Sequence, residues 1–435
     1  MIQQFGIEDF KSYRRATLPL APLTVLIGAN ASGKSNAIEA LQFLSWLARG
    51  RRLGDVFQAI QDHELSFRGT FLEVTHKNAD GFALECVLSG DRPWHRLRIR
   101  VGVTREGMRI QEESIEGAGA GLPLYRIEAR LDEYGHDVAV SYNNFARGGK
   151  KPRITCTDQQ AVFTQLQTPS RFAKGHLKSQ KVIPETVERF RRALEGILFL
   201  DPDPSAMRDY SFIVDRVLQR NGANISSVLH NLCVAQEKKD QVLEFVRSLP
   251  EQDIVDIAFW EGPRNDVMFR LTETFGGERQ EWDASALSDG TLRVLAVAAA
   301  VLSTPEDSLV VIEEVDNGVH PSRAELLLGR IHQQAVQRRL KVLLTTHNPA
   351  LLNALPLEAV PDVVCCYRDP REGDSRLVRL ADLPDYPELV AQGPLGSLMT
   401  QGVLERFLKS RTSPEEKKDR ALRWLDSLRV AEGKP

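Results

Sequence analysis

Residues 23–36 read LTVLIGANASGKSN, and this stretch decides the fold. Leu23–Ile27 is a short, apolar, partly β-branched run, which indicates a buried strand. Apolar residues then recur at helical spacing, and Gly50 is a plausible stop; these residues are Ala37, Ile38, Leu41, Leu44 and Ala48. The octet at 28–35, GANASGKS, lies between strand and helix and has Gly, four residues, and Gly-Lys-Ser. This order predicts a phosphate-binding loop.

Each residue type in this loop suits a bound triphosphate. Gly28 and Gly33 let the backbone curl so that N–H groups point at phosphate oxygens, beside the positive end of the helix dipole. Lys34 places a charge against the β- and γ-phosphates, and the Ser35 hydroxyl ligates Mg²⁺. The sequence therefore predicts ATP and Mg²⁺ as cofactors. The alternative is a glycine-rich turn with a merely solvated lysine.

The composition indicates an ordinary globular chain of more than one domain. At 435 residues it is too long for one ordinary core. Its residues are 42% apolar and 26% charged. Because the net charge is −3, nucleic-acid binding would need a local basic patch.

Cysteine usage and hydropathy favour a reducing cytoplasm. The five cysteines are scattered without zinc-type CxxC pairs. The longest strongly apolar stretch, residues 292–302, is too short to span a bilayer. The first residues enter a β-rich pattern with no signal peptide. We therefore expect a cytoplasmic protein with no membrane partner.

A second candidate site lies far downstream, after the apolar run Ser308–Ile312. Two adjacent carboxylates at the end of a buried strand are costly unless a cation or a proton transfer needs them. We interpret them as a Walker B motif, in which Glu313 holds Mg²⁺ and Glu314 accepts a proton from the attacking water. Most such motifs begin with Asp, so Glu313 is a departure. The alternative is two exposed acids after a strand.

Two further motifs follow the same logic. Ser288 and Gly290 precede the apolar helix at 292–302, where a helix N-terminus presents a hydroxyl and bare N–H groups to an anion. Lys341–Thr346 is a strand pattern that ends at His347, and Asn-Pro follows. A histidine after a strand is usually structural, but here it follows the Walker B strand by one helix, where a γ-phosphate sensor is needed.

Together these motifs resemble the ABC-type ATPases of the SMC, RecF and OLD group. GANASGKSN, which includes Asn30 and Asn36, is similar to their Walker A motif. LSDGTLR resembles their signature motif, with Asp289 and Thr291 in place of the usual Gly and Gln. VVIEEVDNGVHP resembles Walker B with the D-loop, and LLTTHNP resembles the switch-histidine segment. The opening IEDFKSYRRATLPL is also typical of the group.

The resemblance covers roughly residues 1–60 and 285–405 and implies a dimeric mechanism. Two protomers would pack head to tail, so that Ser288 and Gly290 of one cap the γ-phosphate held by Lys34 of the other. Asp316 of the D-loop would lie across that interface, and His347 would contact the γ-phosphate. A homodimer or higher homo-oligomer is therefore expected. The glutamine of the family's Q-loop cannot be placed in this sequence.

The predicted fold class is α/β: an ABC-type P-loop ATPase head with a mixed sheet and an antiparallel β subdomain, plus a mostly helical insertion. Residues 70–142 alternate with period two, from FLEV at 71–74 onward, and 184–249 have helical period. No heptad pattern is sustained over several repeats, so we do not expect a long coiled coil. We assign an N-terminal ATPase lobe with the β meander to 1–145, a mainly helical insertion to 146–280, a C-terminal ATPase lobe to 281–405 and a tail helix to 406–435.

Four basic clusters could meet DNA, although each alone is more typical of a solvated face. They are Arg49, Arg51 and Arg52; Arg96, Arg98 and Arg100; Arg147, Lys150, Lys151 and Arg153; and Arg171, Lys174, Lys178 and Lys181. The tail helix after Ser413 either packs on its own domain or docks on a partner.

The leading hypothesis is an ATPase that assembles on ATP and controls a separate effector, a nuclease or toxin, in anti-phage defence. The segment after His347 is too short for the TOPRIM nuclease domain of OLD nucleases, so we expect the effector on another chain. The alternatives are a RecF-like, ATP-dependent DNA-binding protein in repair and a scaffold with negligible turnover. A transporter subunit is weaker, because Lys34 and Ser288 lie far apart and LSGGQ is missing.

Overall fold

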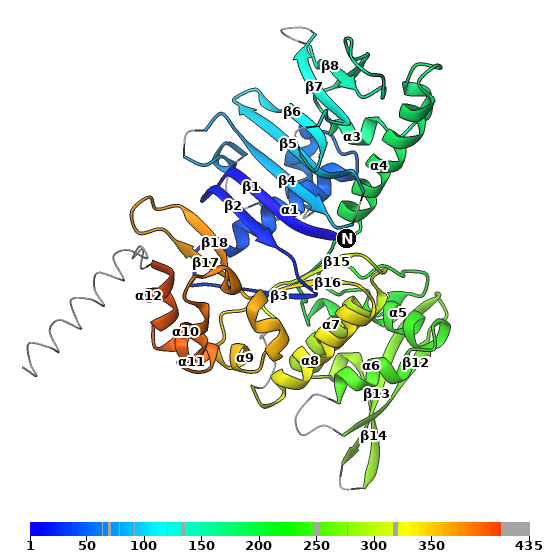
Figure 1. Ribbon diagram of the computed structural model, residues 1–435. Coiled ribbons are helices and arrows are strands. Elements are labelled where there is room, and N and C mark those ends of the chain that lie inside the picture. The colour runs from blue at the N-terminus through cyan, green and yellow to red at the C-terminus, as the bar shows by residue number, and fades with distance from the viewer. Residues whose placement is uncertain are drawn as a thin grey trace, which may run out of the picture.

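The computed structural model describes residues 1–409 except 63, 68–70, 78, 91, 120, 132–134, 248–252, 276 and 316–320. Within them the chain forms three sheets (Figure 1). The largest lies in the upper part of that view, the second crosses the middle of the molecule, and the third lies below it. The strands of the first sheet all come from residues 2–157, whereas the second sheet combines β3 with strands from the later part of the chain. The two halves of the sequence therefore fold together in the second sheet.

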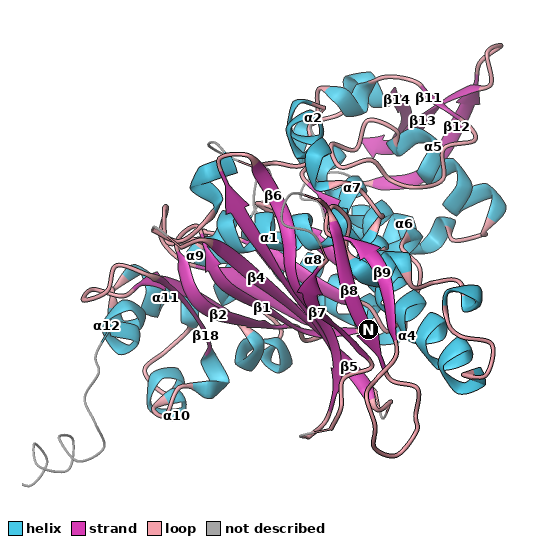
Figure 2. Ribbon diagram, turned by 90° about the horizontal axis from the view of Figure 1, so that it is seen from above, coloured by secondary structure: helices cyan, strands magenta, loops and turns pink. Residues whose placement is uncertain are grey.

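The largest sheet is antiparallel, with eight strands in the order β2-β1-β4-β5-β6-β7-β8-β9, and Figure 2 shows them from above. Its strands are β1 Ile2–Phe10, β2 Tyr13–Pro19, β4 Gly81–Leu88, β5 Trp94–Thr104, β6 Gly107–Gly117, β7 Tyr125–Arg130, β8 Asp137–Tyr142 and β9 Arg153–Thr157. The predicted β meander is thus confirmed, with one exception. Phe71–Val74 is a 3-10 helix, because its neighbourhood bonds to the β1–β2 turn, with the Lys11 N–H donating to the Val74 carbonyl at 2.8 Å.

The second sheet has six strands in the order β10-β15-β16-β3-β17-β18. They are β3 Leu23–Ile27, β10 Leu198–Leu200, β15 Leu309–Ile312, β16 Lys341–Thr345, β17 Val364–Arg368 and β18 Ser375–Arg379. All neighbours from β10 to β17 pair in parallel, and β18 is an antiparallel edge. The carboxyl ends of β10, β15, β16 and β3 therefore share one edge, which is where open α/β sheets bind ligands.

Helices cover both faces of this sheet, which explains its near-continuous apolar strands. Helix α1 (Lys34–Ala48) lies between this sheet and the antiparallel sheet, whereas α7 (Asp289–Ser303) and α8 (Pro321–Gln337) lie on the other face. Alternate residues of β3 enter different cores: Leu26 packs with α1, and Val25 packs with α7. The strand, loop and helix predicted around the phosphate-binding loop are confirmed by β3 and α1.

The third sheet corrects the prediction that residues 146–280 are mainly helical. The helices there are α3 Val162–Gln165, α4 Leu177–Glu195, α5 Ile225–His230, the π-helix Asn231–Ala235 and α6 Lys239–Val246. They are followed by the antiparallel strands β12 Ile254–Glu261, β13 Asp266–Phe275 and β14 Glu278–Asp283, with β11 Ser211–Phe212 beside β13. The physical reason is a period of two: Val267, Phe269 and Leu271 are all buried on one face of β13.

The remaining helices are short and lie mainly at the C-terminal side. They are α2 Val56–Gln61, α9 Pro349–Asn353, α10 Tyr386–Val390, α11 Leu395–Thr400 and α12 Val403–Lys409. The predicted tail helix after Ser413 lies outside the described residues.

Candidate nucleotide-binding site

One cavity of about 610 Å³ opens at the shared edge of the parallel sheet. It brings together the phosphate-binding loop, both acids after β15 and the histidine after β16. Its lining includes Ala29–Asn36 of the loop and helix start, Glu313, Glu314, Thr345–His347, Asp201 and Arg368. Segments that are 300 residues apart in sequence therefore meet at a single polar site, as the motif order predicted.

The backbone of the loop has the shape that its glycines predicted. Gly28 and Gly33 have φ values of 154° and 121°, in the region that favours glycine. A Cβ atom on Gly28 would lie 2.2 Å from the Cys366 carbonyl oxygen, so the loop also packs too closely for a side chain there. Helix α1 begins at Lys34. The N–H groups of its first turn have no carbonyl acceptor within the helix and are therefore available to a ligand.

The donors in the cavity fit a triphosphate. The Lys34 ammonium donates to the carbonyls of Gly28 and Ala29, at 2.5 and 3.2 Å, so it lies inside the curl of the loop. Ser35, one residue into α1, lines the same cavity. An ammonium, a hydroxyl and a helix N-terminus together are the donor set that phosphate oxygens and a bound Mg²⁺ require.

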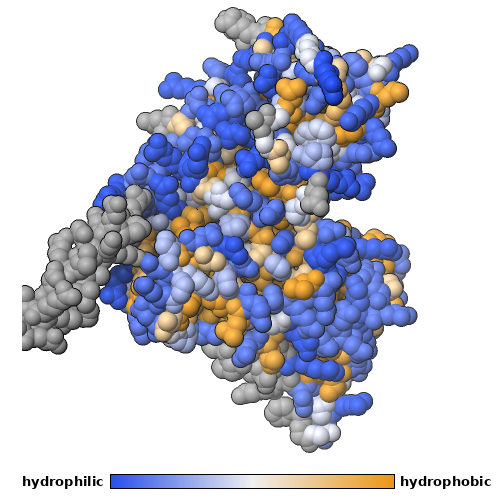
Figure 3. All heavy atoms as spheres, in the orientation of Figure 1, coloured by the Kyte–Doolittle hydropathy of each residue, from blue (hydrophilic) through white to orange (hydrophobic). Residues whose placement is uncertain are grey.

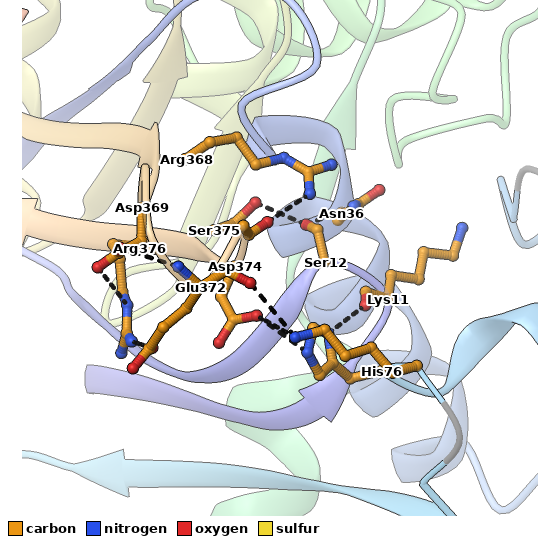
Figure 4. A network of polar contacts seen from close by, with 12 residues as sticks. Lys11, Ser12, Asn36, His76, Arg368, Asp369, Glu372, Asp374, Ser375 and Arg376 are labelled. Atoms are coloured by element: carbon orange, nitrogen blue, oxygen red, sulfur yellow. Dashed lines mark hydrogen bonds and ion pairs between the residues drawn. The ribbon is translucent and has the colours of Figure 1, made fainter.

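Side chains from both ends of the chain hold the back of the loop (Figure 4). The Ser32 carbonyl accepts from the Ser375 hydroxyl at 2.5 Å and from the Cys366 thiol at 3.3 Å. The Ser375 hydroxyl oxygen also lies 2.7 Å from the Ser12 hydroxyl, from which it accepts, and the Asn36 amide donates to the Ser12 oxygen at 2.7 Å. Asn36 therefore lines the cavity while its amide bonds to the loop's support, a role that the sequence did not suggest.

A buried carboxylate ties this support to the β1–β2 turn. Asp374 is 1% exposed, and one of its oxygens lies 3.1 Å from both the His76 Nε2 and the Lys77 Nζ. The other ring nitrogen of His76 lies 2.8 Å from the Lys11 carbonyl oxygen (Figure 4). Burial of an ionised carboxylate is tolerated only with such partners. Asp374 thus fixes the turn before β18 against the turn that carries Ser12.

The two acids after β15 have different environments. Glu313 has a side chain that is 21% exposed, and it accepts from the Arg220 guanidinium at 2.9 Å. Glu314 is exposed, with φ of 50°, and its N–H donates to the Thr345 hydroxyl at 2.9 Å. A left-handed glutamate is uncommon and costs backbone energy. The strained backbone and the bond to β16 aim the second acid at the cavity mouth.

His347 and the segment after it are arranged for exposure. His347 is exposed at the cavity, two residues after β16 ends at Thr345. The Asn348 N–H donates to the Thr346 hydroxyl at 3.0 Å, and the Asn348 side chain caps α9 by accepting from the Ala350 N–H at 2.9 Å. The predicted break at Asn-Pro is therefore a helix cap that ends the strand at the histidine.

The signature residues lie away from this cavity. Ser288 is the N-cap of α7 and accepts from the Thr291 N–H at 3.2 Å. Ser288 is exposed, Gly290 is half-buried, and neither is among the described residues that line the cavity of their own chain. Arg208 holds this loop by donating to the Leu287 carbonyl and the Asp289 carboxylate. The predicted D-loop residue, Asp316, lies outside the described residues.

Comparison with known proteins then places the sequence. Residues 23–110 and 166–353, more than half of the chain, match the family described as "AAA domain, putative AbiEii toxin, Type IV TA system". The chain belongs to this AAA family. The matched ranges include both halves of the cavity, the loop at Lys34 and the acids at Glu313 and Glu314.

Relatives of this AAA family member are RecF and SMC proteins. It is 37% identical to the DNA replication and repair protein RecF of Gloeobacter violaceus over 119 residues, 26% of this chain and 28% of that protein. It is 35% identical to the structural maintenance of chromosomes protein 1 of Arabidopsis thaliana over 91 residues, 19% of this chain and 8% of that protein. The chain thus spans less than a third of these relatives. The RecF of Heliobacterium modesticaldum is 23% identical over 357 residues, 77% of this chain and 90% of that protein.

The family member is therefore a RecF/SMC-like, ABC-type ATPase in sequence. Among solved structures, an SMC head domain from Thermotoga maritima aligns with 87% of this chain and 98% of that one, with a TM-score of 0.41 and 14% identity. An SMC head bound to the C-terminal winged-helix domain of ScpA aligns with 87% of this chain and 96% of that one, with a TM-score of 0.46 and 13% identity.

The surface of the family member is mostly hydrophilic on the face in Figure 3, where hydrophobic residues gather mainly toward the middle and lower part. Among the helices that the structure describes, none has the length and apolar character needed to cross a bilayer.

The basic clusters predicted from the sequence differ in their partners. The arginines of β5 face carboxylates on neighbouring elements: Arg98 lies 3.0 Å from Glu8, and Arg100 lies 2.6 Å from Asp80. That stripe is charge-compensated. In the fourth cluster, the Lys178 ammonium lies 4.5 Å from the centre of the Phe145 ring, which stands two residues before Arg147 of the third cluster.

Sequence reasoning missed three charged residues at the site: Asp201 and Arg368, which line the cavity, and Arg220, which binds Glu313. Asp201 follows β10, the strand beside β15, and lines the cavity. Arg220 pairs with Glu313 across 93 residues of sequence. A short apolar run before Asp201 was the one available signal, since a carboxylate at the end of a buried strand had been informative at Glu313 as well.

Proposed function

We propose that this AAA family member binds ATP with Mg²⁺, hydrolyses it, assembles head to tail when ATP is bound, and controls a separate effector. One observation carries the proposal: Lys34, Glu314 and His347 converge on one cavity while Ser288 lies exposed outside it. The cavity has a phosphate-binding loop, a candidate base and a γ-phosphate contact but no signature serine. A second copy is needed to supply that serine.

The residues of the cavity divide the chemistry among them. Lys34 and the first turn of α1 hold the phosphates, and Ser35 and Glu313 would hold Mg²⁺, with Asn30 and Gly33 shaping the loop. A bound Mg²⁺ neutralises phosphate charge and polarises the phosphoryl oxygens. Glu314 accepts the proton of the attacking water, and its exposure at the cavity mouth suits that task. His347 contacts the γ-phosphate and so distinguishes ATP from ADP.

Completion by a second copy follows from the position of α7. This helix has 15 residues, and its N-terminus, capped by Ser288, reaches the surface. A helix N-terminus attracts anions. Ser288 and Gly290 of one protomer therefore cap the γ-phosphate held by Lys34 of its partner, with Asp316 at the same interface. ATP then stabilises the dimer by binding the assembled form more tightly than the separate chains.

We place this ATPase in anti-phage defence, where its assembly state would switch a nuclease or toxin on another chain. The family description, which names a putative toxin and a toxin–antitoxin system, supports this setting. Co-expression of the chain with the product of an adjacent gene tests it. The proposal expects a complex that changes with ATP, and a lack of any association in both nucleotide states would contradict it.

A RecF-like role in DNA repair is the second candidate. The likeness to RecF over 77% of this chain supports it, and so does the position of Lys178 of the fourth basic cluster, whose ammonium lies over the ring of Phe145, two residues before the third cluster begins. Such binding would weaken steeply with salt. Substitution of Lys150 and Lys151 by Glu should weaken DNA binding further. A DNA affinity that does not change with salt concentration would contradict this role.

Ser288→Arg tests the head-to-tail assembly. The substitution leaves the cavity of its own chain intact, so each copy should bind ATP normally while ATP-driven dimers disappear in mass photometry and turnover falls. Ser303→Arg, the same substitution at the opposite end of α7, is the matched control and should dimerise. Normal dimers and turnover in the Ser288→Arg variant would indicate a monomeric mechanism instead.

A further inference from the structure

Residues 201–220, which we call the strap, touch both ends of the proposed mechanism. The strap begins with Asp201 in the nucleotide cavity and ends with Arg220 on Glu313. Midway, Arg208 holds the loop that carries Ser288. We propose that the strap transmits occupancy of the chain's nucleotide cavity to its own signature loop, with Arg208 and Arg220 as positioning residues. This inference rests on the proposed function.

The two ends of the strap are joined at the cavity. The Asp201 N–H donates to the Arg220 carbonyl at 2.8 Å, and the Glu313 N–H donates to the Leu200 carbonyl at 3.0 Å. The Arg220 guanidinium lies 2.9 Å from Glu313 and 4.0 Å from Asp201. It also donates to the hydroxyl of Ser66. Arg220 is therefore held by both strands of the β10–β15 pair and responds to any change in the charge on Glu313.

A cation brought by the nucleotide would face the same carboxylate that Arg220 binds. Like charges that share a carboxylate repel each other, and the attraction of the carboxylate is divided between them. Binding of Mg²⁺ with a nucleotide should therefore loosen or shift Arg220. Because the backbone of Arg220 bonds to Asp201, such a shift moves the base of the strap.

The middle of the strap is rigidly packed, so a shift at its base can reach the signature loop. Met207 is fully buried, and Gly222, with φ of 76°, leaves room for it: a Cβ atom on Gly222 would lie 3.0 Å from the Met207 Cγ. Met207 thus wedges the strap against the turn that follows Arg220. A displacement of the turn at Gly222 therefore moves Met207, the residue before Arg208.

The middle of the strap also holds the signature loop, through two of the three hydrogen bonds that the Arg208 guanidinium donates. Arg208 donates to its own strap at the Pro204 carbonyl, at 2.9 Å, and to the Leu287 carbonyl at 2.9 Å and the Asp289 carboxylate at 2.7 Å. Leu287 and Asp289 flank Ser288 on both sides. Charge-assisted bonds of this kind fix geometry better than neutral ones. The position of Ser288 is therefore set by Arg208.

Hydrogen exchange at residues 284–292 tests the inference in the full-length chain. The probe is ADP with Mg²⁺, which lacks the γ-phosphate that the sandwich needs, and mass photometry checks that the chain stays monomeric. In the wild type, binding should change amide exchange several-fold at 287–291. Arg220→Ala should still bind ADP but lose that change, Arg220→Lys should restore part of it, and Arg208→Ala should exchange fast in both states.

Arg216→Ala is the matched control, because Arg216 is an exposed arginine of the same strap. It should behave like the wild type. An Arg220→Ala variant that binds ADP and shows the full wild-type change would overturn the inference, as would a wild type that binds ADP without any change at 287–291. A wild type that binds no nucleotide would instead overturn the proposed function.

Discussion

Ser375 donates a hydrogen bond of 2.5 Å to the carbonyl of Ser32, although 343 residues separate them in the sequence. The contact joins the last strand of the parallel sheet to the centre of the phosphate-binding loop. Tyr13 supports the next carbonyl, since its buried hydroxyl donates to Gly33 at 3.0 Å, and burial raises the pKa of this phenol well above its usual range. The loop therefore keeps its shape because both ends of the chain hold it.

Removal of this support should weaken nucleotide binding without touching the phosphates. Tyr13→Phe loses one buried hydrogen bond, worth about 1 kcal/mol, and we expect about five-fold weaker binding of ATP. Titration of a fluorescent ATP analogue measures the affinity. Tyr367→Phe, on β17 of the parallel sheet, is the control. Equal affinities in all three proteins would show that the loop does not depend on Tyr13.

Lys34→Ala should abolish ATP-driven assembly. The ammonium lies inside the curl of the loop, against the carbonyls of Gly28 and Ala29, where phosphate oxygens would replace them. Calorimetry should detect little ATP binding, and mass photometry should show no dimers with ATP. Lys181→Ala is the control, because Lys181 is exposed on α4 and does not line the cavity. If dimers form equally well without Lys34, the role assigned to Lys34 in the phosphate-binding loop is refuted.

Glu314→Gln should bind ATP but slow its turnover by about two to four orders of magnitude, as loss of a general base does. Phosphate release measures turnover, and the variant should accumulate ATP-bound dimers. Glu325→Gln, on the outer surface of α8, should turn over normally. Unchanged turnover in Glu314→Gln would mean that another group accepts the proton of the attacking water.

Glu113 should make stability depend on pH. Its carboxylate is 1% exposed, and burial raises its pKa to about 7 from an ordinary 4.5, although Tyr125, Val162 and Phe163 all donate to it. Below pH 4.5 the group is protonated in both the folded and the unfolded states. As the pH rises toward 7, the unfolded state loses its proton first, so the folded state loses up to about 3 kcal/mol of relative stability.

Urea unfolding between pH 4.5 and 7.5 measures this effect. The free energy of unfolding should fall with rising pH more steeply in the wild type than in Glu113→Gln. Glu112→Gln, at the exposed neighbouring position, should keep the wild-type slope. Parallel slopes for the wild type and Glu113→Gln would exclude Glu113 as the source.

The sequence predicted those parts of the site that are local. A buried parallel strand is an apolar run, and polar residues just after it lie at the ligand edge, so Glu313 and His347 could be found from a few neighbours. Lys34 could be found because the glycine-rich pattern at 28–35 is itself local. The pairs Ser375–Ser32, Asp374–His76 and Arg220–Glu313 could not, because each joins segments that approach only in the folded chain. Neither partner of these pairs stands in a distinctive local pattern.

The third sheet was missed for a related reason. Strands β12 and β13 carry charged and aromatic residues on their outer face, so their alternation is weaker than in the meander, and the preceding helices α4 to α6 extended the helical interpretation too far. Asp316 and the tail helix lie outside the described residues, and their assignments stay predictions.

The central claim is that one copy's signature loop completes the other's nucleotide cavity, and a cross-link tests it most directly. Ala31 lies exposed on the loop and Ala286 lies exposed two residues before Ser288, whereas the native cysteines are all buried. Ala31→Cys and Ala286→Cys are introduced on differently tagged copies in the Glu314→Gln background, mixed, and treated with a short bismaleimide. The account predicts a cross-link between the two tags with ATP and Mg²⁺ and none with ADP. ATP-bound dimers that never link these two positions would contradict it.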